Sequence, residues 1–241
     1  LLWCDNFFDQ SIWWGPGHTG GTRYNNIRAN GRTPPGDDQT YMWRSNDAVS
    51  FCTKGYDAFL LAYEQNGDPR MLEALEAQLA YAREHLHVNQ GECRNIGDVR
   101  DFIELHERTG DPRHLGEALR LFRELRTQLS AGNLFSQNGH PIEPEPPFIE
   151  EDGFGYRHPF PKPYILGYAL AGLPALARHA PEEPRLREVI QAVADFMASA
   201  QDPVGGWRYP HPRSSQILLS QAVEHAWQLA QACELLGPQE R

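Results

Sequence analysis

The sequence feature that most constrains the fold is a short phrase that occurs twice. Gly-Asp-Pro-Arg stands at residues 67–70 and again at residues 110–113, 43 residues later, and helical periodicity flanks both copies. A weaker third copy lies at residues 183–190. A period of roughly 40 to 50 residues with one helix–turn–helix per repeat is typical of an array of α-hairpins. The sequence therefore predicts an all-α fold built as a helical-hairpin array.

The chemistry of the phrase explains why it separates two helices. Glycine ends a helix, aspartate accepts hydrogen bonds from the first amides of the next helix, and proline is tolerated in its first turn. Apolar side chains at helical spacing lie on both sides of each copy. This pattern predicts about seven helices, at residues 46–65, 70–88, 94–108, 112–130, 163–179, 184–200 and 213–236.

The chain divides by composition into two parts. Residues 1–45 are aromatic and rich in glycine and proline, which indicates a loop-rich N-terminal segment. Residues 46–241 form the α-hairpin repeat domain, interrupted by a long Pro-rich loop at residues 131–162. Because this loop ends in a strongly aromatic stretch, we expect it to be ordered and functional.

The composition excludes some classes of partner. A formal net charge of −10 argues against nucleic acid, which requires a basic face. No apolar run approaches the roughly 20 residues of a membrane span, so we expect no membrane partner and a soluble protein. Asp5 and Asp9 interrupt the apolar N-terminus, so it does not resemble a signal peptide. Since the chain begins at Leu1, we expect a trimmed or partial protein, and its cellular location stays open.

The four cysteines predict neither a disulfide framework nor a zinc site. Cys4, Cys52, Cys93 and Cys233 are scattered without a C-x-x-C pair. We therefore expect no metal site and no cofactor, and metal dependence stays open.

Helices joined by Gly-Asp-Pro-Arg turns, together with the Gly-Gly-Trp at residues 205–207, resemble the (α/α) toroid, or six-hairpin, proteins. The resemblance covers roughly residues 45–237. That group includes many glycoside hydrolases, polysaccharide lyases and sugar epimerases, and terpenoid cyclases share the architecture. The resemblance implies carbohydrate metabolism. Because a closed ring needs twelve helices, it also implies an incomplete arc, to be completed by the remainder of a longer chain or by further copies in a homo-oligomer, or else a smaller open array.

A narrower resemblance concerns the stretch that begins at Glu92 and Cys93. It is similar to the glutamate–cysteine helix of the β-L-arabinofuranosidase-like hydrolases, in which a glutamate and cysteines bind zinc and one cysteine is the nucleophile. Here Glu92 and Cys93 are adjacent, and the downstream cysteine pair of that family is missing. The departure argues against a zinc–thiolate mechanism in this chain.

Topology suggests where a site lies. If alternate helices form an inner layer, the connections before the first, third, fifth and seventh helices share one end. These connections span residues 37–46, 90–98, 153–164 and 205–213, and they are the richest in Trp, Tyr, His, Arg and Asp. We expect them to enclose a glycan cleft, in which aromatic faces stack on sugar rings.

Two chemistries compete for this cleft. Hydrolysis needs a pair of carboxylates, whereas uronate lyase or epimerase chemistry needs a Tyr or His base with cations. Asp98 and Asp101 lie one turn apart at the front of the helix at residues 94–108, so we expect Asp98→Asn to abolish turnover and leave thermal unfolding nearly unchanged. The candidate catalytic residues are Asp98, Asp101, Glu92, Asp38, His158, Tyr156 and His211. The candidate substrate-binding residues are Trp43, Arg44, Arg94, Lys162, Tyr164, Trp207, Tyr209 and Arg213.

The sequence therefore favours an enzyme, a glycoside hydrolase acting on an oligo- or polysaccharide. The alternatives are a uronate polysaccharide lyase or sugar epimerase, and a non-catalytic helical-repeat scaffold that binds glycan or protein. A scaffold predicts no buried ionisable cluster. We interpret His225 as structural and expect His85, His87 and His114 at the surface.

Overall fold

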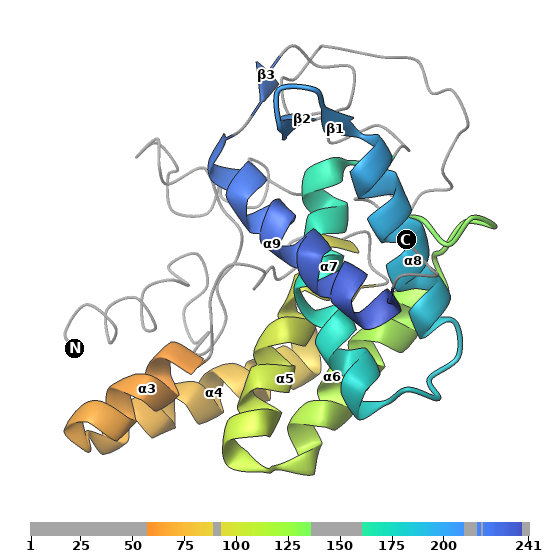
Figure 1. Cartoon of the computed structure of the whole chain (residues 1–241). Helices are drawn as coiled ribbons and strands as arrows, with labels where there is room; N and C mark the ends of the chain where they lie inside the picture. The colour runs from red at the N-terminus through yellow and green to blue at the C-terminus, as the bar shows by residue number, and fades with distance from the viewer. Residues whose placement is uncertain (1–56, 89–92, 136–160, 210–215, 218, 238–241) are drawn as a thin grey trace, which may run out of the picture. The chain divides into compact units, whose positions relative to one another are not determined.

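The computed structural model describes residues 57–88, 93–135, 161–209, 216–217 and 219–237. The N-terminal segment and most of the Pro-rich loop, about which the sequence makes predictions, lie outside this range. Two compact units, Leu1–His87 and Val88–Arg241, are described separately. The described residues contain seven α-helices and three very short strands, which confirms the predicted all-α hairpin array (Figure 1).

The described part of the first unit is one helical hairpin, α3 (Asp57–Asn66) and α4 (Pro69–His85). Gly67 adopts a φ of 69°, and its N–H donates to Tyr63 O at 2.7 Å to end α3. Asp68 Oδ1 accepts the Arg70 N–H at 3.0 Å and caps α4, with Pro69 in the first turn. The Gly-Asp-Pro-Arg phrase thus closes one helix and opens the next, as predicted.

The second copy of the phrase has the same geometry in the second unit. It joins α5 (Asp98–Thr109) to α6 (Pro112–Arg126). Gly110 has a φ of 69° and donates its N–H to His106 O at 2.8 Å. Asp111 Oδ1 accepts the Arg113 N–H at 2.9 Å. The weaker third copy differs, because Arg185 precedes its helix with a φ of 65° and gives no side-chain cap.

The second unit is organised around α7 (Pro163–His179), which contacts α5, α8 (Leu186–Ser199) and α9 (Leu219–Leu236) (Figure 1). A helix that is apolar on nearly all sides must be surrounded by protein, and twelve residues of α7 are buried. Two of them are glycines that allow close approach. A Cβ at Gly172 would lie 2.4 Å from the Arg100 backbone nitrogen, and one at Gly167 would lie 2.2 Å from His225 Nδ1.

The helices α5, α7 and α9 run parallel to one another. Gly172 of α7 lies against Arg100 of α5, and seven residues further along both helices His179 Nε2 lies 2.8 Å from Glu107 Oε1. Because the residue numbers increase by seven in both helices between these two contacts, α5 and α7 run in the same direction and in register. α8 returns antiparallel after the short connection from α7, and its first turn reaches the end of α9, where Arg187 Nη2 donates to Leu236 O at 3.3 Å. The unit therefore has an inner layer of α5, α7 and α9, with α6 and α8 as returning helices.

A small antiparallel sheet lies between α8 and α9. It consists of β1 (Gln201–Asp202), β2 (Gly206–Tyr209) and β3 (Gln216–Ile217), in the order β1-β2-β3. Gln201 pairs with Trp207, and Arg208 pairs with Ile217. β1 and β2 lie in the predicted connection after residue 200, and helical periodicity does not reveal them. The predicted helix at residues 213–236 is wrong at its start, because residues 216–217 form β3 and α9 begins at Leu219.

Two further expectations need correction. The predicted helix at residues 94–108 begins as a 3-10 turn, η2 (Cys93–Gly97), and becomes α-helical at Asp98. Asp98, Asp101 and Leu105 of this helix are all buried. His114 is buried and not at the surface, because it packs in the first turn of α6 with Nε2 4.0 Å from the capping Asp111 carboxylate.

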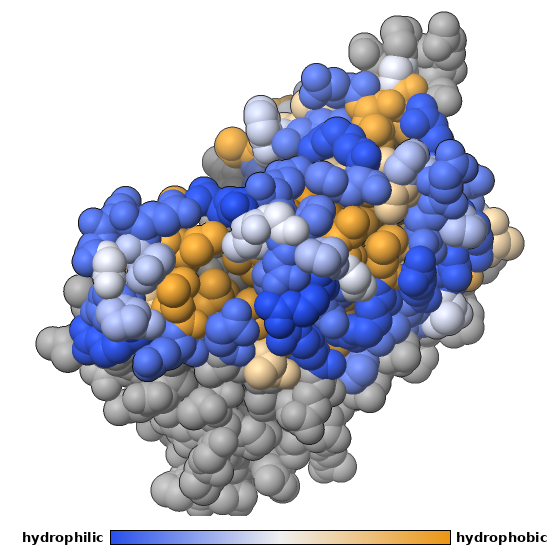
Figure 2. Space-filling model, turned by 90° about the horizontal axis from the view of Figure 1, so that it is seen from below, coloured by the Kyte–Doolittle hydropathy of each residue, from blue (hydrophilic) through white to orange (hydrophobic). Residues whose placement is uncertain are grey.

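On the face that Figure 2 shows, hydrophilic residues make up most of the described surface and hydrophobic residues lie in separate patches. Within the described ranges, no helix combines the length and the apolar character needed to cross a membrane.

Candidate functional site: the inner layer and its groove

The parallel inner layer places its N-terminal junctions at one end of the second unit. η2 precedes α5, residues 161–162 precede α7, and β1 to β3 precede α9. Both η2 and β2 contact α7. The fourth predicted junction, residues 37–46, lies outside the described residues.

Buried polar side chains concentrate in this layer and its junctions. A buried charge is costly unless it is paired and hydrogen-bonded, so such groups indicate a specific local role. In the part of the chain that the structure describes, the buried polar side chains of the inner layer and its junctions are Asn95, Asp98, Asp101, Lys162, His225 and Gln228. His114, the remaining buried polar residue there, lies in α6.

Arg100 connects the buried part of α5 to α9. Its Nε and Nη2 both donate to Asp101 Oδ1 at 3.2 Å. Two more carboxylates lie near the same guanidinium, Glu104 Oε1 at 3.7 Å from Nε and Glu224 Oε1 at 3.9 Å from Nη1. Burial disfavours the charged guanidinium, but these three carboxylates outweigh burial and raise the pKa of Arg100.

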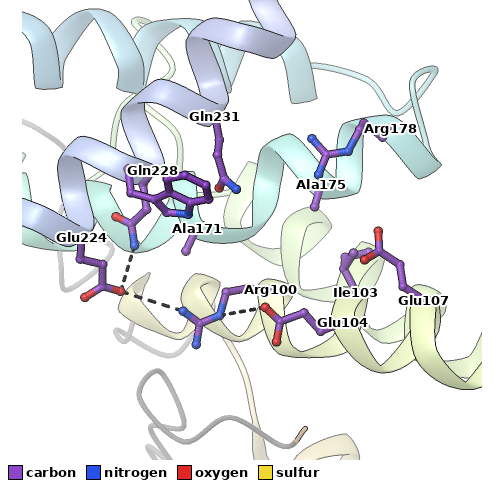
Figure 3. A pocket seen from close by; sticks show the side chains of 11 residues that line it. Arg100, Ile103, Glu104, Glu107, Ala171, Ala175, Arg178, Glu224, Gln228 and Gln231 are labelled. Atoms are coloured by element: carbon purple, nitrogen blue, oxygen red, sulfur yellow. Dashed lines mark hydrogen bonds and ion pairs between the residues drawn. The ribbon is translucent and has the colours of Figure 1, made fainter.

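A polar groove of about 300 Å³ is lined by residues of α5, α7 and α9 (Figure 3). Ala171 and Ala175 of α7 form its floor, while α5 and α9 supply the two walls. Trp227 on the α9 wall is 66% exposed. The remaining lining residues are Arg100, Ile103, Glu104, Glu107, Arg178, Glu224, Gln228 and Gln231.

On α9, His225 and Gln228 form a buried pair, of which Gln228 also lines the groove. His225 Nδ1 lies 3.0 Å from Gln228 Oε1, and Gln228 Nε2 donates to Glu224 Oε1 at 3.0 Å. Trp207 packs against the His225 ring in a T-shaped arrangement, with centroids 5.8 Å apart. Burial lowers the pKa of His225 more than the Gln228 contact and the Glu224 charge raise it, so the imidazole is neutral near pH 7.

The predicted site residues fall into three groups. Asp98, Asp101, Lys162, Tyr164 and Trp207 belong to the inner layer or its junctions, and all five are buried. Arg94 lies in η2 and Tyr209 ends β2, which places their backbones at the same end. The remaining candidates lie outside the described residues: Glu92, Asp38, His158, Tyr156, His211, Trp43, Arg44 and Arg213.

None of the described candidates lines the groove. Sequence reasoning missed the residues that do, although a signal for them exists. The positions 100, 104 and 107 of α5 share one helical face, as do 171, 175 and 178 of α7 and 224, 228 and 231 of α9. The same i, i+4, i+7 spacing in three inner helices indicates one continuous surface.

Among the described residues, no group of three or more His, Cys, Asp or Glu side chains is arranged to hold a metal ion. The chemistry that this arrangement offers is that of carboxylates, guanidinium groups, amides and one exposed indole. Comparison with protein-family models, with curated proteins and with solved structures gives no match for this chain.

Proposed function

We propose that the protein is a carbohydrate-active enzyme, a glycoside hydrolase that binds an oligosaccharide in the groove between α5 and α9. The observation that carries the proposal is the position of two carboxylates on opposite walls. Glu104 of α5 and Glu224 of α9 lie near one guanidinium, that of Arg100, and both are partly exposed. Glycosidases place two carboxyl groups on either side of the scissile bond, roughly 5 to 9.5 Å apart.

The rest of the groove suits a sugar. An indole face is a stacking surface for a sugar ring, and Trp227 offers one at the rim. Gln231, Arg178 and Glu107 provide hydrogen-bonding groups further along the walls. Such a combination of one aromatic face with several polar groups fixes the orientation of a polyhydroxylated ligand.

Two features support an enzyme rather than a binding scaffold. A scaffold needs no buried ionisable groups, whereas Asp98, Asp101 and Lys162 are buried at one end of the inner layer. The parallel inner helices with returning outer helices also agree with the resemblance to (α/α) toroids, of which this unit would form an arc.

The test is a panel of neutral and uronic-acid oligosaccharides assayed for new reducing ends and for ultraviolet absorbance. We expect new reducing ends without absorbance, because an unsaturated uronate product absorbs and a hydrolysis product does not. Glu104→Gln and Glu224→Gln should each lower kcat at least 100-fold. Glu188→Gln, on the exposed side of α8, is the matched control.

The other outcomes of the panel distinguish the alternatives. Absorbance in place of simple hydrolysis supports the lyase alternative, and binding without turnover supports a scaffold. Full activity in both Gln variants removes the groove from the proposal.

A further inference from the structure

The buried pair of His225 and Gln228 on α9 determines how Glu224 is held. The contacts run from Trp207 to His225, then to Gln228, and then to Glu224 in the groove. His225 and Gln228 are 1% and 2% exposed. Two buried side chains, His225 and Gln228, are therefore linked by hydrogen bonds to Glu224, a carboxylate that a ligand in the groove can contact.

The orientation of the Gln228 amide follows from the chemistry of its two neighbours. An ionised carboxylate only accepts hydrogen bonds, so the amide nitrogen of Gln228 must face Glu224. The amide oxygen then faces His225, and Nδ1 of the imidazole must carry the proton to donate to it. Nε2 of His225 is unprotonated in this tautomer, and it has no hydrogen-bond partner among the described residues.

The surroundings of His225 hold the ring in place. Gly167 of α7 leaves space for the imidazole. A Cβ at this position would lie 2.2 Å from His225 Nδ1. The Trp207 indole packs on the ring and is itself fixed, because its Nε1 donates to Met197 O at 2.7 Å. Burial favours the neutral ring. These contacts hold the imidazole in one position.

The consequence for Glu224 is that its two oxygens differ. Oε1 accepts from Gln228 Nε2 and faces Arg100, whereas Oε2 has no hydrogen-bond partner among the described residues. We infer that His225 is a positioning residue, which holds Gln228 through the Nδ1–H tautomer so that Glu224 presents Oε2 to a ligand in the groove. The catalytic consequence of this inference rests on the proposed function. The hydrogen bonds from His225 through Gln228 to Glu224, here called the relay, do not depend on that function.

The relay is tested first by the ¹⁵N chemical shifts of the His225 ring in the full chain. We expect protonated Nδ1 and unprotonated Nε2. Gln228→Leu removes the acceptor, and Glu224→Gln removes the group that fixes the amide, so both variants should give a mixture of tautomers. Gln231→Leu makes the same change one turn away on the same wall and should leave the shifts unchanged. A protonated Nε2 in the unaltered protein, or unchanged shifts in both relay variants, overturns the inference.

The catalytic consequence is tested by steady-state kinetics on the best glycan of the panel. A displaced catalytic group costs on the order of 100-fold in rate, so Gln228→Leu should lower kcat about 10- to 100-fold with KM nearly unchanged. Gln191→Leu is the matched control, since Gln191 makes the same kind of bond to Asp195 on α8, away from the groove. An unchanged kcat in Gln228→Leu overturns the positioning role.

The two tests separate the two proposals. If no glycan is hydrolysed, the proposed function fails, and the ring shifts still decide the relay. If glycans are hydrolysed but the shifts contradict the tautomer, the relay alone fails.

Discussion

Gly172 of α7 packs directly on the backbone of Arg100 in α5. A Cβ at this glycine would lie 2.4 Å from the Arg100 nitrogen and 2.9 Å from its Cα. Because backbone atoms have no rotamer by which to move away, the two helices must separate to accept any side chain. This contact sets the distance between two of the three helices that form the groove.

We therefore expect Gly172→Ala to destabilise the protein by about 1–3 kcal/mol, the usual cost of overpacking a well-packed contact. Gly116→Ala is the matched control, since Gly116 lies within α6 and a Cβ there meets nothing within 4 Å. That variant should gain about 0.5–1 kcal/mol from helix propensity. Urea unfolding measures both, and equal stability of the two variants would contradict the close packing.

The capping aspartate of α6 should make stability depend on acid pH. The Arg113 side chain and the Arg113 backbone N–H, which both donate to Asp111, hold the pKa of this carboxyl far below its usual value. A carboxyl whose pKa is lower in the folded state than in the unfolded chain stabilises the fold at any pH above its unfolded-state pKa, about 3.9. This stabilisation is lost as the pH falls toward the folded-state pKa.

Asp111→Asn tests this charge, because asparagine keeps the capping oxygen. The thermal midpoint of the variant should be lower than that of the unaltered protein at pH 6, and the difference should shrink at pH 3. A difference that is the same at both pH values would show that the charge of Asp111 adds nothing.

Trp227 should contribute to ligand binding and little to folding. Its side chain is 66% exposed on the groove wall, so truncation removes few internal contacts. Trp227→Ala should weaken glycan affinity about five- to tenfold, as expected for the loss of one stacking contact. Titration calorimetry measures the change, with Val204→Ala as the control because Val204 is 81% exposed in the turn after β1. Unchanged affinity would remove Trp227 from the site.

The buried position of Asp98 changes what its replacement should do. The side chain is 0% exposed in the first turn of α5. Since changing a buried polar group costs about 1–3 kcal/mol, Asp98→Asn should lower stability, contrary to the expectation from the sequence. Urea unfolding beside the exposed Glu234→Gln control measures this, and an unchanged midpoint would restore the original expectation.

Local chemistry accounts for what the sequence predicts well. Each Gly-Asp-Pro-Arg turn depends on neighbouring residues only, so the ends of α3 and α5 and the starts of α4 and α6 follow from the phrase itself. The long helix α7 is apolar on most sides, and this composition explains its central place.

The groove depends on long-range packing and is harder to predict. Arg100 and Glu104 on α5 look like a solvent-exposed ion pair when the helix is considered alone. Only the alignment of α5 with α7 and α9, which Gly172 and Gly167 permit, brings Glu224 to the same guanidinium. Asp98 and Asp101 lie one turn apart at the start of α5, as predicted, but periodicity does not show that both are buried.

The small sheet between α8 and α9 has a consequence for the integrity of the chain. Its exposed turn at residues 203–205 connects β1 and β2, which pair with each other. The Trp207 indole donates a hydrogen bond to Met197 O near the end of α8 and packs on His225 of α9. Proteolytic cleavage at Val204 would sever the backbone but not these contacts. The two pieces should stay together as a nicked complex, which makes this turn a natural place to divide the protein into complementing fragments.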